Sequence, residues 1–171
     1  ITANNTGGSS AASTGVTATP QVPAPGVPTG LTATAGVAQV TVTWTAVSGA
    51  TSYQLYRGAT LVASPTTTSY IDTSLTAGTA VSYTVKAVNA GGSSAASAAV
   101  SATPTLAAPT GLTATAGNAQ VALTWTAVTG ATSYNVYSGA TLLGSVATTS
   151  YTNTGLTNGT AYSYTVTAVV N

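Results

Sequence analysis

The sequence predicts an all-β protein built from tandem two-sheet β-sandwiches. Short runs of alternating apolar and polar residues recur along the 171 residues, and none has the spacing of an amphipathic helix. Gly and small polar residues separate these runs, so about seven short strands fit in one repeat, which is typical of a two-sheet sandwich. The pattern occurs twice, which indicates at least two such units.

The repeat defines the expected domain organisation. Residues 28–90 align without a gap with residues 109–171, and 44 of the 63 aligned pairs are identical. Residues 1–13 align in the same way with residues 85–97. We therefore expect five parts: 1–20, the final strands of a preceding repeat; 21–27, a Pro-rich linker; 28–104, a complete sandwich; 105–108, a second linker; and 109–171, a sandwich without its last strand.

Each strand of the complete repeat is predicted from alternation and from the turn residues beside it. The expected strands are 29–35, 39–47, 52–57, 60–64, 67–72, 79–89 and 95–103. In the second of them Val40, Val42 and Trp44 share one face, which predicts that they belong to the core. The last is rich in Ala, but it ends in Val-Ser-Ala-Thr-Pro and is therefore interpreted as a strand.

Several motifs, taken together, resemble the fibronectin type III family in its bacterial form. They are the opening PxGLxAxAG, a Trp on the second strand (Trp44 and Trp125), and the run Tyr-x-aliphatic-Tyr that starts at Tyr53 and Tyr134. The closing AVNAGGSSAAS followed by ATP is similar to the last two strands of that family and the loop between them. The resemblance covers nearly the whole chain and implies a row of sandwiches.

The resemblance also implies a tyrosine corner, in which a Tyr hydroxyl bonds to the backbone of the turn before it. The last repeat has the pattern, with Leu156 followed by Tyr162, whereas the middle repeat has Leu75 followed by Val81. A missing hydrogen bond is worth on the order of 1 kcal/mol. We expect the middle domain to be the less stable when complete single domains are compared by chemical denaturation.

The charge content excludes whole classes of function. Only Arg57, Asp72 and Lys86 carry a fixed charge, and the chain has no His and no Cys. Acid–base catalysis, thiol chemistry, and Cys/His or calcium sites all need groups that are absent. Nucleic-acid binding needs clustered cations, and a membrane helix needs about 20 apolar residues. We expect no enzyme, no cofactor, no metal, no nucleic-acid partner and no membrane span, and we predict no catalytic, cofactor-binding or metal-ligating residues.

Four aromatic residues are candidates for stacking on sugars. Trp44 and Trp125 alternate with polar residues as core residues do, and we favour the core for both. Tyr56 and Tyr137 are predicted to point outward, where they could contact carbohydrate or a neighbouring subunit; we favour ordinary surface aromatics. The three charged residues are interpreted as scattered solubilising groups, although strands 52–57 and 79–89 should place Arg57 and Lys86 on one sheet.

Two Asn-x-Thr patterns, Asn4-Asn5-Thr6 and Asn158-Gly159-Thr160, fit N-glycosylation, and the run Thr66-Thr67-Thr68 offers hydroxyls for O-glycosylation. Asn158 also has a conformational explanation, because Asn-Gly is a common turn. Covalent glycans are therefore one expected partner of this nearly uncharged surface. An intact mass equal to that of the bare sequence would exclude them.

The main functional prediction is a structural protein that builds an extracellular bacterial filament, stalk or surface layer. Near-identical repeats, short Pro-rich linkers and a nearly uncharged surface favour association with copies of itself. The alternatives are a spacer region of a secreted polysaccharide-degrading enzyme and an adhesin stalk. We expect the chain to be a window of a longer array; the other reading is a subunit whose residues 1–20 complete the last sandwich of the next copy.

Overall fold

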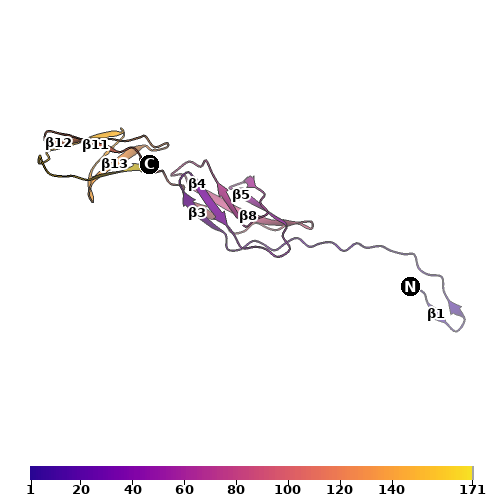
Figure 1. Ribbon diagram of the computed structural model, residues 1–171. Helices are drawn as coiled ribbons and strands as arrows, with labels where there is room; N and C mark the ends of the chain where they lie inside the picture. Colours follow the sequence, from indigo (N-terminus) through magenta and orange to yellow (C-terminus); the bar gives the residue numbers. More distant parts are fainter. Residues whose placement is uncertain (171) are drawn as a thin grey trace.

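The structure, a computed structural model that describes residues 1–170, has two β-sandwiches in a row behind an extended N-terminal segment (Figure 1). Within those residues every regular element is a strand, so the predicted all-β class is confirmed. No helix that could cross a membrane occurs in this part of the chain. Asn171, the predicted end of the last sandwich, lies outside the described residues.

The middle sandwich consists of two antiparallel sheets. One sheet has the order β3-β4-β7, and the other has the order β10-β8-β5-β6 with β9 added to β8. Their bounds are β3 (Thr32–Gly36), β4 (Gln39–Thr43), β5 (Ser52–Arg57), β6 (Thr60–Ala63), β7 (Ser69–Asp72), β8 (Val81–Asn89), β9 (Gly92–Ser93) and β10 (Val100–Ala102). This is the two-sheet arrangement that the alternation predicts.

The last sandwich repeats this arrangement with two strands fewer, since among residues 1–170 it has no equivalents of β9 and β10. Its sheets have the orders β11-β12-β15 and β14-β13-β16. The bounds are β11 (Thr113–Gly117), β12 (Gln120–Thr124), β13 (Ser133–Ser138), β14 (Thr141–Val146), β15 (Ser150–Thr154) and β16 (Tyr164–Val169). Among residues 1–170 no strand pairs with the outer edge of β16, where the middle sandwich has β10.

The two cores lie between the sheets and follow the predicted alternation. Val40, Val42 and Leu55 are fully buried in the middle sandwich, as are Leu123 and Val136 in the last. The Trp that directly follows β4 or β12 packs edge-on against the Tyr of β5 or β13, with ring centroids 5.4 Å apart in the middle sandwich and 5.5 Å in the last. Aromatic pairs in this geometry add to the energy of burial.

The tyrosine corner is present in the last sandwich only. The Tyr162 hydroxyl accepts a hydrogen bond from the backbone N–H of Thr157 at 3.1 Å. The equivalent residue of the middle sandwich, Val81, packs against the core and has no hydroxyl. The sequence-based expectation of the corner is therefore confirmed, and the stability difference expected from it stays a prediction.

The predicted strand 95–103 is wrong over its first half. Only Val100–Ala102 forms a strand, and before it the buried positions are Ser94 and Ser97, three residues apart. A spacing of three is the repeat of a polyproline II chain, not of a β-strand. The two serines bond to β8 through their side chains: Ser94 Oγ accepts from Ala87 N at 3.0 Å, and Ser97 Oγ accepts from Val85 N at 3.1 Å.

Residues 1–13 form a two-stranded ribbon with the same contacts as residues 85–97 of the middle sandwich. No second sheet packs against this ribbon in the described residues. Strands β1 (Asn4–Asn5) and β2 (Gly8–Ser9) form a hairpin. Beyond it Ala3 N donates to Ser10 Oγ at 3.1 Å, and the N-terminal amine of Ile1 donates to Ser13 Oγ at 3.3 Å. These are the two serine bonds of the middle sandwich again, which shows that the ribbon's hydrogen bonds are local. Residues 1–20 are exposed throughout.

Candidate functional site

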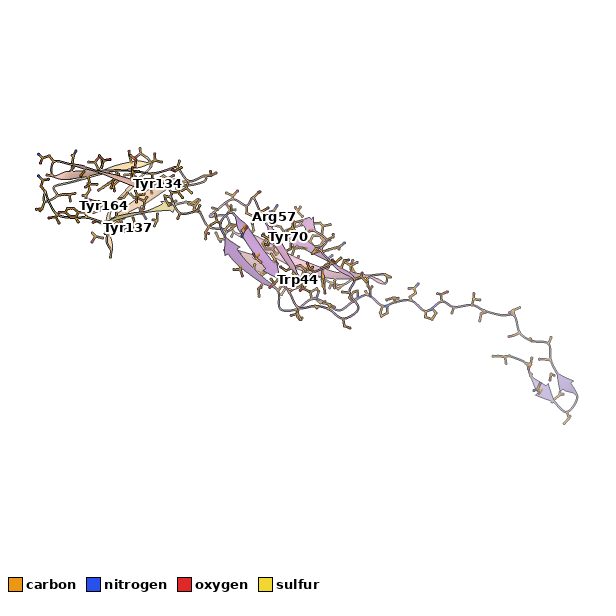
Figure 2. The ribbon with its side chains drawn as sticks, viewed as in Figure 1. Trp44, Arg57, Tyr70, Tyr134, Tyr137 and Tyr164 are labelled. Atoms are coloured by element: carbon orange, nitrogen blue, oxygen red, sulfur yellow. The ribbon has the colours of Figure 1, made fainter. Side chains whose placement is uncertain are left out.

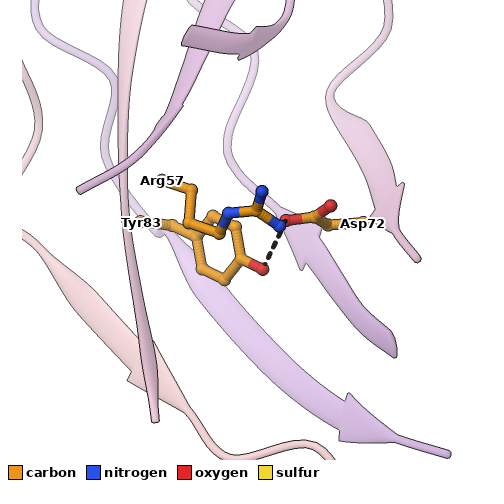
Figure 3. Close-up of polar contacts among 3 residues, drawn as sticks. All are labelled: Arg57, Asp72 and Tyr83. Atoms are coloured by element: carbon orange, nitrogen blue, oxygen red, sulfur yellow. Dashed lines mark hydrogen bonds and ion pairs between the residues drawn. The ribbon is translucent and has the colours of Figure 1, made fainter. Parts of the chain in front are cut away.

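The middle sandwich contains one polar cluster, formed by Arg57, Asp72 and Tyr83 (Figure 3). Arg57 Nη1 lies 2.9 Å from Asp72 Oδ2, and the Tyr83 hydroxyl donates to the same oxygen at 2.8 Å. Asp72 is 7% exposed and Tyr83 is fully buried, while the guanidinium end of the pair reaches solvent. The interpretation of Arg57 and Asp72 as scattered surface charges is therefore wrong.

The last sandwich fills the same position without any charge. Asn153 replaces Asp72 and Ser138 replaces Arg57. Asn153 Nδ2 donates to the hydroxyl of the half-buried Tyr164 at 3.1 Å, so the equivalent Tyr again has a hydrogen-bond partner. The cluster thus satisfies a buried hydroxyl between the two sheets, and a structural role explains it.

Burial raises the pKa of the Tyr83 phenol well above its usual value, and the hydrogen bond to Asp72 adds to the shift because it holds the phenol proton. The nearby Arg57 acts in the opposite direction with a smaller effect. A phenol held neutral in this way does not act as a base near neutral pH.

The four aromatic candidates are accounted for within the fold. Trp44 and Trp125 are 5% and 6% exposed, which confirms their place in the core (Figure 2 labels Trp44). Tyr56 and Tyr137 are half-buried, and Lys86 Nζ lies 5.4 Å from the centre of the Tyr56 ring, within cation–π range. Lys86 and Arg57 do share one sheet, on the paired strands β8 and β5. Contact of Tyr137 with carbohydrate stays a prediction.

Within residues 1–170 no three His, Cys, Asp or Glu side chains gather where a metal ion could bind. Asn4 lies in the exposed strand β1 and Asn158 in an exposed turn, and both side chains are engaged in hydrogen bonds. Asn4 accepts from Ser9 Oγ, and Asn158 Oδ1 accepts from Ala119 N at 2.9 Å. The glycan hypothesis stays a prediction. The Asn158 side chain already forms hydrogen bonds within the fold.

The linker between the two sandwiches and the residues that contact it form what we call the joint. Thr105 in the linker donates to Gly36 O at 2.9 Å and accepts from Ala38 N at 3.1 Å, which makes a parallel bridge beside the β3–β4 turn. Pro104 O accepts from Gly78 N at 2.9 Å. The linker is therefore fixed to the end of the middle sandwich before it enters the last one.

Apolar contacts fix the other side of the joint. A hollow of about 500 Å³ lies between the sandwiches, lined mainly by small and apolar residues of both, including Val37, Leu75, Leu106 and Val128. A Cβ built on Gly78 would lie only 2.6 Å from Val170 of the last sandwich, so the absence of a side chain at this position lets the two sandwiches approach.

The first linker is docked in a similar manner. Asn89 Nδ2 donates to Pro23 O at 2.9 Å and to Gly49 O at 3.2 Å, which ties the linker to two loops of the middle sandwich. Gly91 lies so close to the backbone of Val22 that no Cβ fits there. Sequence reasoning identified both linkers as Pro-rich or short but missed these anchoring contacts, because they join residues far apart in the chain.

The end of the last sandwich that is equivalent to the joint end of the middle one carries different residues. Val37 and Ala77, which line the joint, are replaced by Asn118 and Asn158. Asn158 Nδ2 donates to Asn118 Oδ1 at 2.9 Å, while its Oδ1 accepts the Ala119 amide, the equivalent of the Ala38 amide that Thr105 satisfies. The replacement of two apolar residues by two Asn residues is the sequence feature from which this difference could have been predicted.

A comparison with models of protein families finds no match. The chain is 46% identical to exoglucanase B of Cellulomonas fimi, over 99% of this chain and 18% of that protein. It is 40% identical to chitinase A1 of Niallia circulans, over 89% of this chain and 24% of that protein. The chain therefore spans a quarter or less of the length of these relatives.

Among solved structures, a segment of two fibronectin type III domains from chicken tenascin is similar to the chain. The TM-score is 0.63 at 20% identity, and the match covers 84% of this chain and 91% of that one. At this identity the likeness shows the fold, and it includes both sandwiches.

Proposed function

The chain belongs to the fibronectin type III family, and on that basis we propose that it is a non-catalytic spacer within a secreted enzyme that degrades a polysaccharide. The exoglucanase and the chitinase, both much longer than this chain, support the proposal, because each contains a stretch similar to nearly all of it. The absence of paired carboxylates and of His from the sequence fits a segment that performs no hydrolysis itself.

The enzyme names in the relatives also favour a location outside the cell. Glucans and chitin are large polymers, and an enzyme that cleaves them has to meet them where they lie. The few charges of this chain fit that setting, since the two cores consist of side chains that are uncharged at ordinary pH.

The anchored linker is the observation that carries the spacer role. Thr105 is bonded on both its N–H and its C=O to the middle sandwich, and Gly78 is in close contact with Val170 of the last one. A joint held in this way keeps two modules at a set distance, whereas a flexible linker allows them to collapse on each other. The filament predicted from the sequence receives less support from the relatives and stays a prediction.

The test places the chain between a catalytic module and a binding module for the same insoluble glucan, with a Gly-Ser linker of equal length as the control. We expect equal activity on soluble oligosaccharides and higher activity on the insoluble polymer when this chain is the spacer. The chain alone should neither cleave cellulose or chitin nor sediment with them. Binding or cleavage by the chain alone would contradict the proposal.

A further inference from the structure

A small hollow lies at the turn between β7 and β8 of the middle sandwich, beside the guanidinium of Arg57. Its volume is about 240 Å³, and six residues line it: Arg57, Ser74, Leu75, Thr76, Thr79 and Val81. Pockets for drug-sized ligands measure about 300–1,000 Å³, so this hollow suits a small ligand or the end of a larger one.

A backbone amide is left available at this hollow because the middle sandwich has no tyrosine corner. In the last sandwich the amide of Thr157 donates to the Tyr162 hydroxyl. The equivalent amide is that of Thr76, and Val81 at the position of Tyr162 has no hydroxyl to accept from it. Among residues 1–170 the Thr76 amide has no other acceptor. Since Val81 lines the hollow, this N–H faces the space that a Tyr ring would otherwise occupy.

Arg57 supplies the charge of the site. Its Nη1 bonds to Asp72, and Figure 3 shows its other terminal nitrogen directed away from that carboxylate. The Arg57 side chain is 36% exposed, and within residues 1–170 the bond to Asp72 is the only one that its guanidinium makes. The outer N–H groups are therefore available to a second acceptor, and carboxylates match the guanidinium best.

The backbone at Ser74 is strained, and the strain keeps a hydroxyl at the hollow. Ser74 has a φ of 59°, in the left-handed region that side chains disfavour, and the equivalent residue of the last sandwich is Gly155 with a φ of 74°. Gly would therefore fit this turn with less strain than Ser. Strained residues of this kind cluster at binding sites, where the side chain has a use that offsets its cost.

The lining of the hollow selects the class of ligand. The Arg57 guanidinium and the Thr76 amide are donors that match the oxygens of a carboxylate. The hydroxyls of Ser74 and Thr79 can donate to or accept from hydroxyl groups of a ligand. Val81 offers an apolar surface for C–H groups. A sugar ring that carries a carboxylate, which is a uronic acid, presents all three kinds of group.

We propose that this hollow binds a uronic acid residue of an acidic polysaccharide, with the carboxylate against Arg57 and the Thr76 amide. The acidic side chain of a protein offers the carboxylate without the neighbouring hydroxyls. Asp72 offsets the charge of Arg57, so the binding is weak and depends on hydrogen bonds as much as on charge.

This binding goes beyond the spacer role and agrees with a chain that does not sediment with cellulose or chitin, because neither polymer carries a carboxylate. The spacer role rests on the bonds of Thr105 and the contact of Gly78, and neither residue lines this hollow. Failure of one proposal therefore leaves the other intact.

The first test is an NMR titration of the whole chain with glucuronate, and with glucose as the matched neutral sugar. We expect glucuronate to shift the Thr76 amide and the Arg57 Nε–H in a saturable manner, with a dissociation constant in the millimolar range. Glucose should bind at least about tenfold more weakly, because it lacks the charged acceptor. The Thr157 amide, which already has an acceptor, is the internal control and should not shift.

The second test uses variants that copy the other sandwich, so that loss of the fold does not confuse the result. Val81→Tyr fills the hollow and gives the Thr76 amide an acceptor, so it should abolish binding and raise the denaturation midpoint. Ser74→Gly should weaken binding and also raise the midpoint, because it relieves the strain. Tyr162→Val is the control: it releases the Thr157 amide beside Ser138, where no cation lies, and should create no site.

Three results would overturn the proposal: equal binding of glucose and glucuronate, binding that survives Val81→Tyr, or no saturable shift at the Thr76 amide. Acetate and glutamate test the ligand class, since they carry the carboxylate without the sugar hydroxyls. Tighter binding of glucuronate than of both supports a uronic acid, and equal binding of either would overturn that assignment.

Discussion

At the scale of single residues, one buried hydroxyl is satisfied in two ways. Tyr83 donates to Asp72, which Arg57 neutralises, and Tyr164 accepts from the uncharged Asn153. Because the same fold tolerates both, the ion pair is not needed for the sandwich to form. In both sandwiches the phenol oxygen has a hydrogen-bond partner. Substitutions that remove this partner should therefore destabilise the sandwich.

Asp72→Ala should lower the free energy of unfolding of the middle sandwich by about 1–3 kcal/mol, because it leaves the Tyr83 hydroxyl without its acceptor. The double change Arg57→Ser and Asp72→Asn copies the last sandwich and should cost less than about 1 kcal/mol. Urea denaturation of the whole chain, with exchange of β8 peptides as the local probe, measures both. A double variant as unstable as Asp72→Ala would show that the charges themselves matter.

Tyr83 also predicts a loss of stability at high pH. Its pKa is raised in the folded state, so above about pH 10 the unfolded chain releases a proton that the folded chain retains. The contribution is fully present below the pKa of the unfolded state and decreases as pH rises toward the folded value. The denaturation midpoint should fall more steeply above about pH 10 in the natural chain than in Tyr83→Phe, with Tyr137→Phe as the control.

Core residues could be predicted from the sequence, and the polar cluster could not. Val40, Val42 and Trp44 follow from a period of two within one strand. Arg57 and Asp72 lie on different sheets. The pattern within a single strand does not show which residues of the opposite sheet it will meet. The available signal was that Asp72 alternates with the exposed Ile71 and therefore faces inward.

At the scale of elements, the segment before β10 bonds to β8 through Ser94 and Ser97, whose backbone N–H groups donate to Ala87 O and Val85 O while their hydroxyls take the place of carbonyl acceptors. Ser94 and Ser97 each donate to the carbonyl of the next residue, which leaves Oγ oriented to accept from β8. The strand over 95–103 was predicted from its closing Val-Ser-Ala-Thr-Pro, and the alanine-rich stretch before it gave no sign of the spacing of three. The same two bonds in the isolated ribbon show that this conformation is encoded locally.

Ser97→Ala should destabilise the middle sandwich by about 1–3 kcal/mol, since the buried Val85 amide loses its acceptor. Ser93→Ala, at an exposed position of β9, is the matched control and should change stability by less than about 0.5 kcal/mol. Denaturant titration measures the cost, and faster exchange at the Val85 amide identifies its source. Equal effects of the two substitutions would mean that the hydroxyl bond contributes nothing.

At the scale of the whole molecule, equivalent ends of the two sandwiches satisfy the same amide in different ways. The joint end of the middle sandwich is apolar and receives Thr105, whereas the equivalent end of the last sandwich uses Asn158 to satisfy the equivalent amide. The sequence predicted a row of sandwiches, but it could not predict the hydrogen bonds of the joint, because they connect residues far apart in the chain.

Thr105→Pro should loosen the joint, because Pro has no N–H to donate to Gly36. Ala107→Pro, two residues further along, is the control, since none of the anchoring bonds involves that residue. The chain has no Cys, so spin labels can be placed specifically at Thr60→Cys and Thr141→Cys, on exposed positions of β6 and β14. The distance distribution should broaden in Thr105→Pro only, and a broad distribution in the natural chain would contradict an anchored linker.

The contacts of Ser94 and Ser97 with β8 predict how the middle sandwich responds to a pulling force. The chain enters and leaves the middle sandwich at opposite ends, so a pull along the row runs parallel to the strands and loads their hydrogen bonds in shear (Figure 1). The continuous backbone pairs of β10 with β8 share that load, whereas between β9 and β10 the bonds to β8 come from Ser94 and Ser97, each through its backbone N–H and its hydroxyl, so fewer bonds per residue resist the pull. Slippage under force should therefore begin at the loop end of this edge, which lets the row lengthen slightly before any core is exposed.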